Sequence, residues 1–245
     1  MLLNLLKLFR ERRLGASYFT SNCQEADDLI LNHIFRELPP PIKENSYKYV
    51  EVGANDAFCE NISFLLAKQG WTGVSIDADP IHEESYATRT KFLKQYNRFI
   101  CAAIGVTDKK IIFTRYKNSF LNSSNNQFKI RAHEDNEDIL ENVPMTTTSL
   151  NEIFSSLEYF HVELLSINTR GADFEILKTL DLDKFAVDVI RIEMLYTGIQ
   201  EITAHPTYRY LYSSGYRLVV KMLRVSFWIK PECKAADWMP RELLI

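Results

Sequence analysis

One stretch, residues 49–56, constrains the fold of this chain more than any other. It reads Tyr-Val-Glu-Val-Gly-Ala-Asn-Asp, an apolar strand that ends in an acidic residue, one glycine and a small polar turn. The next residues, 60–69, have the pattern of a helix. A strand, a tight turn and a helix in this order present backbone N–H groups to a nucleotide-like ligand in doubly wound sheets. A dinucleotide motif needs three glycines at such a turn, so the lone Gly53 favours a ligand without a pyrophosphate, and S-adenosylmethionine is the obvious candidate.

Strand and helix patterns alternate along the rest of the chain, which predicts a doubly wound α/β sheet. The expected strands are mostly continuous apolar runs, as in a parallel sheet covered on both faces; they span residues 47–52, 73–78, 99–104, 110–116, 163–168 and 187–194. Helices are expected over residues 24–38, 60–69, 80–94, 149–157 and 172–180. Two more β-like runs, 216–222 and 225–229, predict an antiparallel hairpin at the sheet's edge.

We expect two parts: an N-terminal helical cap segment over residues 1–42 and an S-adenosylmethionine-binding α/β domain over residues 43–245. The polar stretch 117–142 is too long for a routine connection, so it is interpreted as a substrate-side lid or as a disordered segment. Ser149 and Glu152 have the spacing of a capping box, which predicts a helix start there.

The composition of the chain limits the classes of partner and the compartment that we expect for it. The net charge of −3 gives no basic footprint for nucleic acid. The four scattered cysteines form no C-x-x-C pair, so we expect reduced thiols, a cytoplasmic location and no structural zinc. Residues 1–13 carry a helical apolar stripe with a basic end, which either packs on the domain or on a partner subunit, or lies on a membrane surface. Assembly into a homo-oligomer stays open.

Ligands of doubly wound sheets bind beyond the carboxyl ends of the strands, so the residues there are the candidates. Asp77 ends the second strand at the spacing of a carboxylate that accepts hydrogen bonds from ribose hydroxyls; Asp79 is the second choice, because Asp79-Pro80 is also a good helix start. Small residues at the end of the third strand leave room for an adenine ring. The predicted cofactor-binding residues are Glu51, Gly53, Ala54, Asn55, Asp56, Asp77, Ala78 and Ala102.

Two later strands end in Asn168, Arg170 and Glu193, which are expected to face the same crevice. We predict these three as the catalytic residues.

Four segments in order resemble the FkbM-type methyltransferases, a branch of the class I S-adenosylmethionine-dependent fold. Residues 50–56 (Val-Glu-Val-Gly-Ala-Asn-Asp) are similar to the family's Val-Gly-Ala-Asn-Asp-Gly turn, and residues 70–80 to its Gly-Trp-x-Gly-x-x-Ile-Glu-Pro-Asn-Pro. Residues 18–30 resemble its initial helix, and residues 143–150 with 165–177 its last paired motif. The resemblance runs from about residue 17 to residue 193. It implies a class I methyltransferase that methylates a hydroxyl of a sugar, a glycan or a secondary metabolite.

The chain departs from this pattern at two places. The family's Asp-Val-Glu-Gly is Asn168-Thr169-Arg170-Gly171 here, which makes the crevice about three charge units more positive, and Ala57 stands where the family usually has glycine. Three interpretations of Arg170 stay open: it clamps an anionic acceptor, the site has lost its chemistry, or the arginine pairs with Glu193 or Asp173 and holds the loop.

Methyl transfer to an alcohol requires a general base within hydrogen-bond reach of the hydroxyl. Glu193 is the candidate by position, and His205 and His133 are candidates by residue type. Asn168 is no base, but it can orient a hydroxyl or the cofactor. No metal is expected, because the asparagine removes a hard oxygen ligand from the crevice. Two other functions stay open. The chain is either a catalytically inactive member of the fold that binds cofactor or assembles with a partner, or a nicotinamide-dependent dehydrogenase. The single glycine in the turn argues against the dehydrogenase.

Overall fold

A computed structural model describes residues 21, 23, 25–39, 47–94, 97–125, 137–194 and 198–244 of the chain. The predicted amphipathic helix over residues 1–13 and the candidate base His133 lie outside these described residues.

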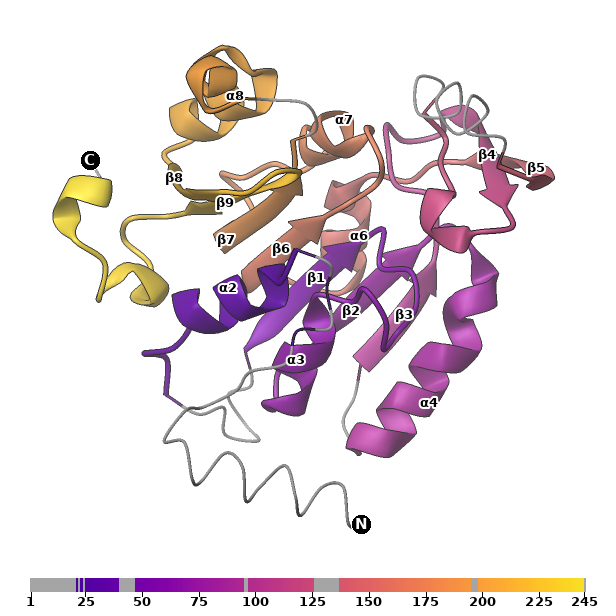
Figure 1. Cartoon of the computed structure of the whole chain (residues 1–245), viewed down its shortest axis with the longest axis horizontal. Coiled ribbons are helices and arrows are strands. Elements are labelled where there is room, and N and C mark those ends of the chain that lie inside the picture. The colour runs from indigo at the N-terminus through magenta and orange to yellow at the C-terminus, as the bar shows by residue number, and fades with distance from the viewer. Residues whose placement is uncertain are drawn as a thin grey trace.

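The centre of the molecule is a seven-stranded sheet in the order β3-β2-β1-β6-β7-β9-β8 (Figure 1). Its parallel strands are β1 (Lys48–Val52), β2 (Thr72–Asp77), β3 (Asn97–Cys101), β6 (His161–Ile167) and β7 (Ala186–Glu193). The strands β8 (Arg217–Lys221) and β9 (Val225–Ile229) form the antiparallel hairpin, with β9 antiparallel to β7. The predicted fold, a doubly wound and mostly parallel sheet with a C-terminal hairpin, is confirmed.

Helices cover both faces of the sheet, because the buried strands are apolar on both sides. One face carries α2 (Asp27–Ile34), α3 (Ser63–Lys68) and α4 (Glu83–Leu93), and the other carries α6 (Leu150–Ser156), α7 (Asp173–Leu177) and α8 (Pro206–Ser213). The alternation along β1 shows the two sides: Tyr49 packs among the residues of α2 and α3, whereas Val50 and Val52 pack with those of α6 and α7.

Short 3₁₀ helices connect these elements: η1 (Pro80–His82), η2 (Ser119–Leu121), η3 (Ile199–Ala204), η4 (Lys234–Ala236) and η5 (Arg241–Leu243). The predicted capping box begins α6, where the Ser149 hydroxyl accepts from the Glu152 N–H and the Glu152 carboxylate accepts from the Ser149 N–H. Nowhere in the described ranges is a helix both long enough and apolar enough to cross a membrane.

One expectation about the middle of the chain is wrong, and one boundary changes. The strand at 110–116 exists as β4 (Lys110–Tyr116), but it lies outside the large sheet and pairs antiparallel with β5 (Ile139–Thr146). The last residues of the polar stretch 117–142 therefore belong to a strand. β5 is exposed along most of its length, so its sequence lacks the buried alternation that would have indicated a strand.

Candidate active site

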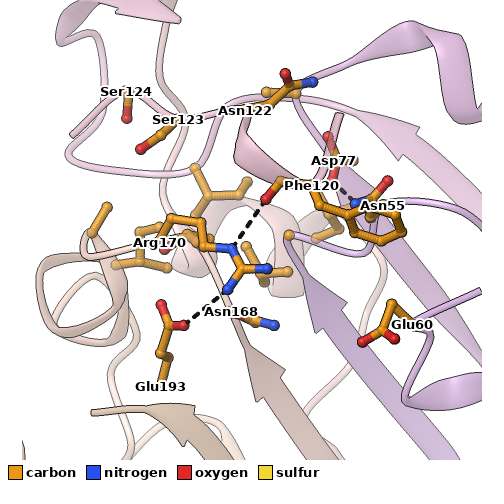
Figure 2. A pocket seen from close by; sticks show the side chains of 18 of the residues that line it. Asn55, Glu60, Asp77, Phe120, Asn122, Ser123, Ser124, Asn168, Arg170 and Glu193 are labelled. Carbon is orange, nitrogen blue, oxygen red and sulfur yellow. Dashed lines mark hydrogen bonds and ion pairs between the residues drawn. The ribbon is translucent and has the colours of Figure 1, made fainter. Parts of the chain in front are cut away.

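A pocket opens beyond the carboxyl ends of β1, β2, β3, β6 and β7, at the switch in strand order between β1 and β6. Figure 2 shows side chains from both sides of this switch facing one space, with residues 119–125 arching beside it. Of the predicted site residues, those that line the pocket are Gly53, Asn55, Asp77, Ala78, Ala102, Asn168, Arg170 and Glu193.

Gly53 lies where the turn after β1 meets the turn after β6, and the two turns belong to different halves of the pocket. Its φ of +73° lies in the left-handed region, and a Cβ at this position would stand 2.0 Å from the carbonyl oxygen of Asn168. The Asn168 N–H in turn donates to the Val52 carbonyl at 2.9 Å. Only glycine permits the turn after β1 to come this close to the turn after β6.

Asp77 stands in the first half of the pocket, which extends from β1 to β3. Its two oxygens accept one backbone N–H each, from Asn55 at 2.8 Å and from Asp79 at 2.9 Å. Burial raises the pKa of Asp77, although the two N–H donors act in the opposite direction. A carboxylate has about four acceptor positions, so this one keeps capacity for the hydroxyls of a ligand.

An apolar recess lies next to Asp77. Ala102, Ala103 and Ile104 follow β3 directly, and Ile111 and Phe113 come from β4. Ile111 and Phe113 were missed from the sequence. Their alternation along the strand puts them on one face, but only the unexpected position of β4 brings that face to the pocket.

Glu51, Ala54 and Asp56, predicted as cofactor contacts, do not line the pocket as the structure describes it. The Glu51 carboxylate points toward α3, accepts from the Ser63 hydroxyl at 2.6 Å and the Ile62 N–H at 3.2 Å, and burial raises its pKa. The side chain of Asp56 accepts from the backbone of the residues that follow it. Both carboxylates are therefore hydrogen-bonded within the protein and stabilise the turn after β1 from the side away from the pocket.

The segment of residues 119–125 is tied to both sides of the pocket. On the first side, Asp79 accepts from Arg115 Nε at 3.0 Å and from Asn122 Nδ2 at 2.9 Å, and it also caps η1. The sequence offers two roles for Asp79, a helix start and a ribose contact, and the structure shows the helix start. On the other side, Asn125 Nδ2 donates to the Gly171 carbonyl at 2.9 Å.

The second half of the pocket centres on the turn after β6, residues 168–171. Asp173 shapes this turn by accepting from the N–H groups of Thr169 at 2.8 Å and Gly171 at 2.9 Å. Arg170 has a φ of +57°, which is uncommon for a residue other than glycine and marks a constrained backbone.

Arg170 points into the pocket and has two partners (Figure 2). Its Nε donates to the Phe120 carbonyl at 3.2 Å, and its Nη1 lies 3.5 Å from Glu193 Oε1. The pairing with Glu193 that we considered from the sequence is therefore present, whereas Asp173 bonds to backbone instead.

Glu193, at the end of β7, is a buried carboxyl group with a raised pKa. Burial, followed by repulsion from Asp173, raises its pKa to about 7, although Arg170 and two further arginines, Arg191 and Arg224, act to lower it. Its Oε2 atom is buried and has no hydrogen-bond partner among the described residues; the same holds for Asn168 Oδ1 and Thr169 Oγ1. Buried polar atoms without partners are uncommon, and three neighbouring ones in a pocket indicate a place for a ligand.

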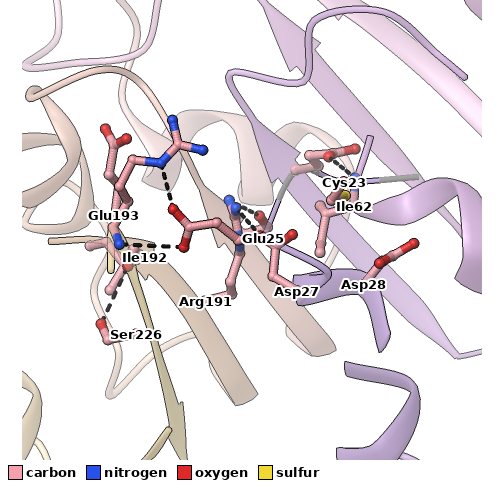
Figure 3. Close-up of polar contacts among 12 residues, drawn as sticks. Cys23, Glu25, Asp27, Asp28, Ile62, Arg191, Ile192, Glu193 and Ser226 are labelled. Atoms are coloured by element: carbon pink, nitrogen blue, oxygen red, sulfur yellow. Dashed lines mark hydrogen bonds and ion pairs between the residues drawn. The ribbon is translucent and has the colours of Figure 1, made fainter. Parts of the chain in front are cut away.

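The N-terminal segment forms a further wall of the pocket, which the sequence did not predict. Figure 3 shows Glu25 and Asp27 beside the ends of β7 and β9. Glu25 accepts from Arg224 Nε at 2.6 Å, and Asp27 forms a buried ion pair with Arg191, whose Nε lies 3.0 Å away. Burial acts to raise the pKa of Asp27, but the Arg191 guanidinium outweighs it and holds that pKa below its usual value.

The remaining candidates lie elsewhere. His205 caps α8, where its Nδ1 accepts from the Thr207 N–H. Two groups in the described ranges have metal-ligand chemistry: Cys23 with Asp27 and Asp28, and His161 with Glu163 and Asp188. Asp27 is held by Arg191, and the second group lies at the start of β6, at the opposite end of the strand from the pocket.

A doubly wound sheet with one glycine at the β1 turn, a carboxylate after β2 and an apolar recess after β3 defines a class I, Rossmann-like site for a nucleoside-containing ligand. The sequence model of the methyltransferase FkbM domain matches residues 51–218, well over half of the chain. The chain belongs to the FkbM methyltransferase family, and S-adenosylmethionine is the cofactor of this class of transferase.

A solved structure of M. capricolum TrmK in complex with S-adenosyl-homocysteine is also similar, with 10% sequence identity and a TM-score of 0.41. The match covers 82% of this chain and 66% of that one, just under two thirds of its length. Among curated proteins, no relative matches.

Proposed function

We propose that this protein transfers a methyl group from S-adenosylmethionine to a hydroxyl oxygen of a sugar, a glycan or a secondary metabolite. Family membership supports methyl transfer. The observation that carries the choice of a hydroxyl is Glu193, a buried carboxyl group of the pocket lining with a pKa of about 7 and one oxygen that has no partner among the described residues. An alcohol must lose a proton as it attacks, and a base of this pKa is suited to take it near neutral pH.

The residues present fit the cofactor. Asp77 has free acceptor capacity for the ribose hydroxyls, and the recess of Ala102, Ile111 and Phe113 offers an apolar surface to the adenine. The unpaired Asn168 Oδ1 is suited to a donor on the methionine portion or on the acceptor. When bound, S-adenosylmethionine supplies a methyl carbon that its sulfonium activates for in-line displacement.

Glu193 then acts as the general base. The acceptor hydroxyl gives its proton to the Glu193 carboxylate. With S-adenosylmethionine bound, the acceptor oxygen would then take the methyl group and the sulfur would keep the electron pair of the carbon–sulfur bond, which would give a methyl ether and a neutral thioether. Residues 119–125 restrict water beside the reacting groups, because they bridge Asp79 and Gly171 across the pocket.

A cytoplasmic location and a small-molecule acceptor complete the proposal. All four cysteines are free thiols, which supports a reducing compartment.

The test is a turnover assay with labelled S-adenosylmethionine and a panel of neutral sugars, sugar acids, sugar phosphates and hydroxylated metabolites. Methyl ethers should form with at least one class, and Glu193→Gln should lower kcat by about 10³-fold, the middle of the range for general-base loss. Glu175→Gln, at an exposed carboxyl on α7, is the matched control and should keep wild-type turnover. Cofactor binding without any product would instead favour the catalytically inactive alternative, and NAD binding in place of S-adenosylmethionine would contradict the proposal.

A further inference from the structure

We propose that Arg170 selects acceptors that carry an anionic group, a carboxylate or a phosphate, near the hydroxyl. In this account the anionic group replaces Glu193 as the partner of the Arg170 guanidinium and thereby uncovers the Glu193 carboxyl. The inference rests on the proposed function for the role of Glu193.

The contact between Arg170 and Glu193 is loose. A single nitrogen–oxygen distance of 3.5 Å joins them, whereas strong charge-assisted hydrogen bonds measure about 2.7–2.9 Å. The other two arginines of the pocket are held more closely by carboxylates, at 3.0 Å for Arg191 Nε and 2.6 Å for Arg224 Nε. Of these three pocket arginines, Arg170 therefore gives up its carboxylate most easily.

The guanidinium of Arg170 is already oriented for an exchange of partners. Its Nε is anchored on the Phe120 carbonyl, so the arm of the side chain stays in place while the Nη end changes partner. A guanidinium carries five N–H donors in a planar fork that matches a carboxylate or phosphate with two parallel hydrogen bonds. Arg170 lines the pocket, and its side chain is 20% exposed.

Glu193 needs such an exchange before it can act. Its side chain is 1% exposed, and its Oε2 has no partner in the described part of the chain. A hydroxyl cannot reach a carboxyl group that is covered in this way. Movement of the Nη end of Arg170 toward an anion in the pocket opens the approach to Glu193, so the acceptor's charge and its deprotonation are coupled.

Carboxylates of the N-terminal segment hold two of the three pocket arginines: Asp27 pairs with Arg191 and Glu25 pairs with Arg224. The lining also holds Glu60 and Asp77, and a sulfonium cofactor would bring one positive charge beside these acids. Arg170 is therefore the pocket arginine that can turn to an anionic group on the acceptor. Loss of Arg170's attraction also makes Glu193 a stronger base, since Arg170 lowers its pKa.

The test measures how readily the Glu193 carboxyl reacts with a water-soluble carbodiimide and glycine ethyl ester, read by peptide mass spectrometry. The probe is inorganic sulfate, compared with sodium chloride at equal ionic strength, on the full chain without cofactor. Sulfate should increase labelling of Glu193 about fivefold, by drawing Arg170 away.

The Arg170→Gln variant tests the same point without an anion. In the absence of sulfate, its Glu193 carboxyl should be labelled about ten times faster than that of wild type, and sulfate should not change this rate. Glu175, with a side chain that is 66% exposed, is the internal reference and should label equally throughout. The matched variant Arg209→Gln, on the exposed side of α8, should behave as wild type.

A second arm uses turnover and separates the two anions. Arg170→Gln should lower kcat/KM by about 100-fold for sugar acids or sugar phosphates, whichever is the better wild-type substrate. For neutral sugars of the same skeleton it should raise kcat/KM, because the variant no longer covers the Glu193 carboxyl. Equal labelling of Glu193 in sulfate and chloride, or equal losses for charged and neutral acceptors, would overturn the inference while leaving methyl transfer intact. A sulfate response in a protein that neither binds S-adenosylmethionine nor forms product would instead contradict the proposed function and leave the partner exchange standing.

Discussion

The two turns that meet at Gly53 are built in different ways. The turn after β1 is supported from behind by a buried network: Asn61 Nδ2 and the Tyr86 hydroxyl both donate to the Ala54 carbonyl, and Glu51 holds the start of α3. The turn after β6 has an arginine at positive φ and two buried side-chain oxygens, and a third buried oxygen lies beside it on Glu193. None of these three oxygens has a hydrogen-bond partner within the part of the chain that the structure describes.

The difference shows which half is complete before a ligand arrives. On the cofactor half, the backbone is fixed and the Asp77 carboxylate is oriented by two N–H donors. On the half that we propose for the acceptor, three buried polar oxygens lack hydrogen-bond partners among the described residues, and we infer that an acceptor would supply those partners. Unsatisfied and strained groups of this kind are characteristic of functional sites, where they cost stability.

Gly53→Ala should have the largest effect, because it affects both halves at once. A Cβ 2.0 Å from the Asn168 carbonyl, at a φ of +73°, should lower the free energy of unfolding by about 3 kcal/mol. Urea unfolding followed by circular dichroism measures it. Gly198→Ala is the matched control, since no atom of the residues that the structure describes lies within 4 Å of its added Cβ. Equal stabilities of the two variants would mean that the turns do not meet as described.

Glu193→Gln should stabilise the fold at alkaline pH. A carboxyl whose folded pKa is raised from 4.5 to about 7 favours folding only while it is protonated, and that contribution is lost as pH rises through about 7. At pH 8 the variant should therefore be more stable than wild type by about 2 kcal/mol, and the gain should shrink toward pH 5. Urea unfolding at both pH values tests this, and a gain that does not depend on pH would show that Glu193 is not perturbed.

The pH dependence of turnover should show the smallest effect. The Glu193 base is active when ionised, so kcat/KM should rise with pH through a midpoint of about 7. Arg170→Gln removes an attraction that lowers this pKa, so the midpoint should move upward by about one unit or less. Initial rates from pH 5.5 to 9 measure the shift, and a downward movement would contradict the pairing of the two side chains.

Much of the cofactor half could be predicted from the sequence, because local patterns determine it. The apolar run into Gly53 and the spacing to Asp77 indicate neighbouring strand ends without any tertiary information. The same reasoning placed Glu193 and Asn168 correctly at strand ends. It could not show that Glu51 points toward α3, since the direction of one side chain in a strand buried on both faces is not visible in an apolar run.

The parts that were missed depend on contacts between distant residues. Phe113 reaches the pocket only because β4 leaves the main sheet and pairs with β5. Glu25 forms a wall because it pairs with Arg224, which lies 199 residues further along the chain. Neither pairing leaves a periodic signal in the sequence, because single ion pairs and exposed strands have none.

The central claim is that the pocket has a cofactor half and an acceptor half. Its most direct test is calorimetric titration of S-adenosylhomocysteine into three proteins: wild type, Asp77→Asn and Glu193→Gln. Loss of charged hydrogen bonds to the ribose should raise the dissociation constant of Asp77→Asn by about 30-fold, equivalent to about 2 kcal/mol. Glu193→Gln should bind within about twofold of wild type, because its side chain serves the acceptor and not the cofactor. Unchanged binding by Asp77→Asn, or a loss of binding by Glu193→Gln as large as that expected for Asp77→Asn, would contradict the separation of the pocket into a cofactor half and an acceptor half.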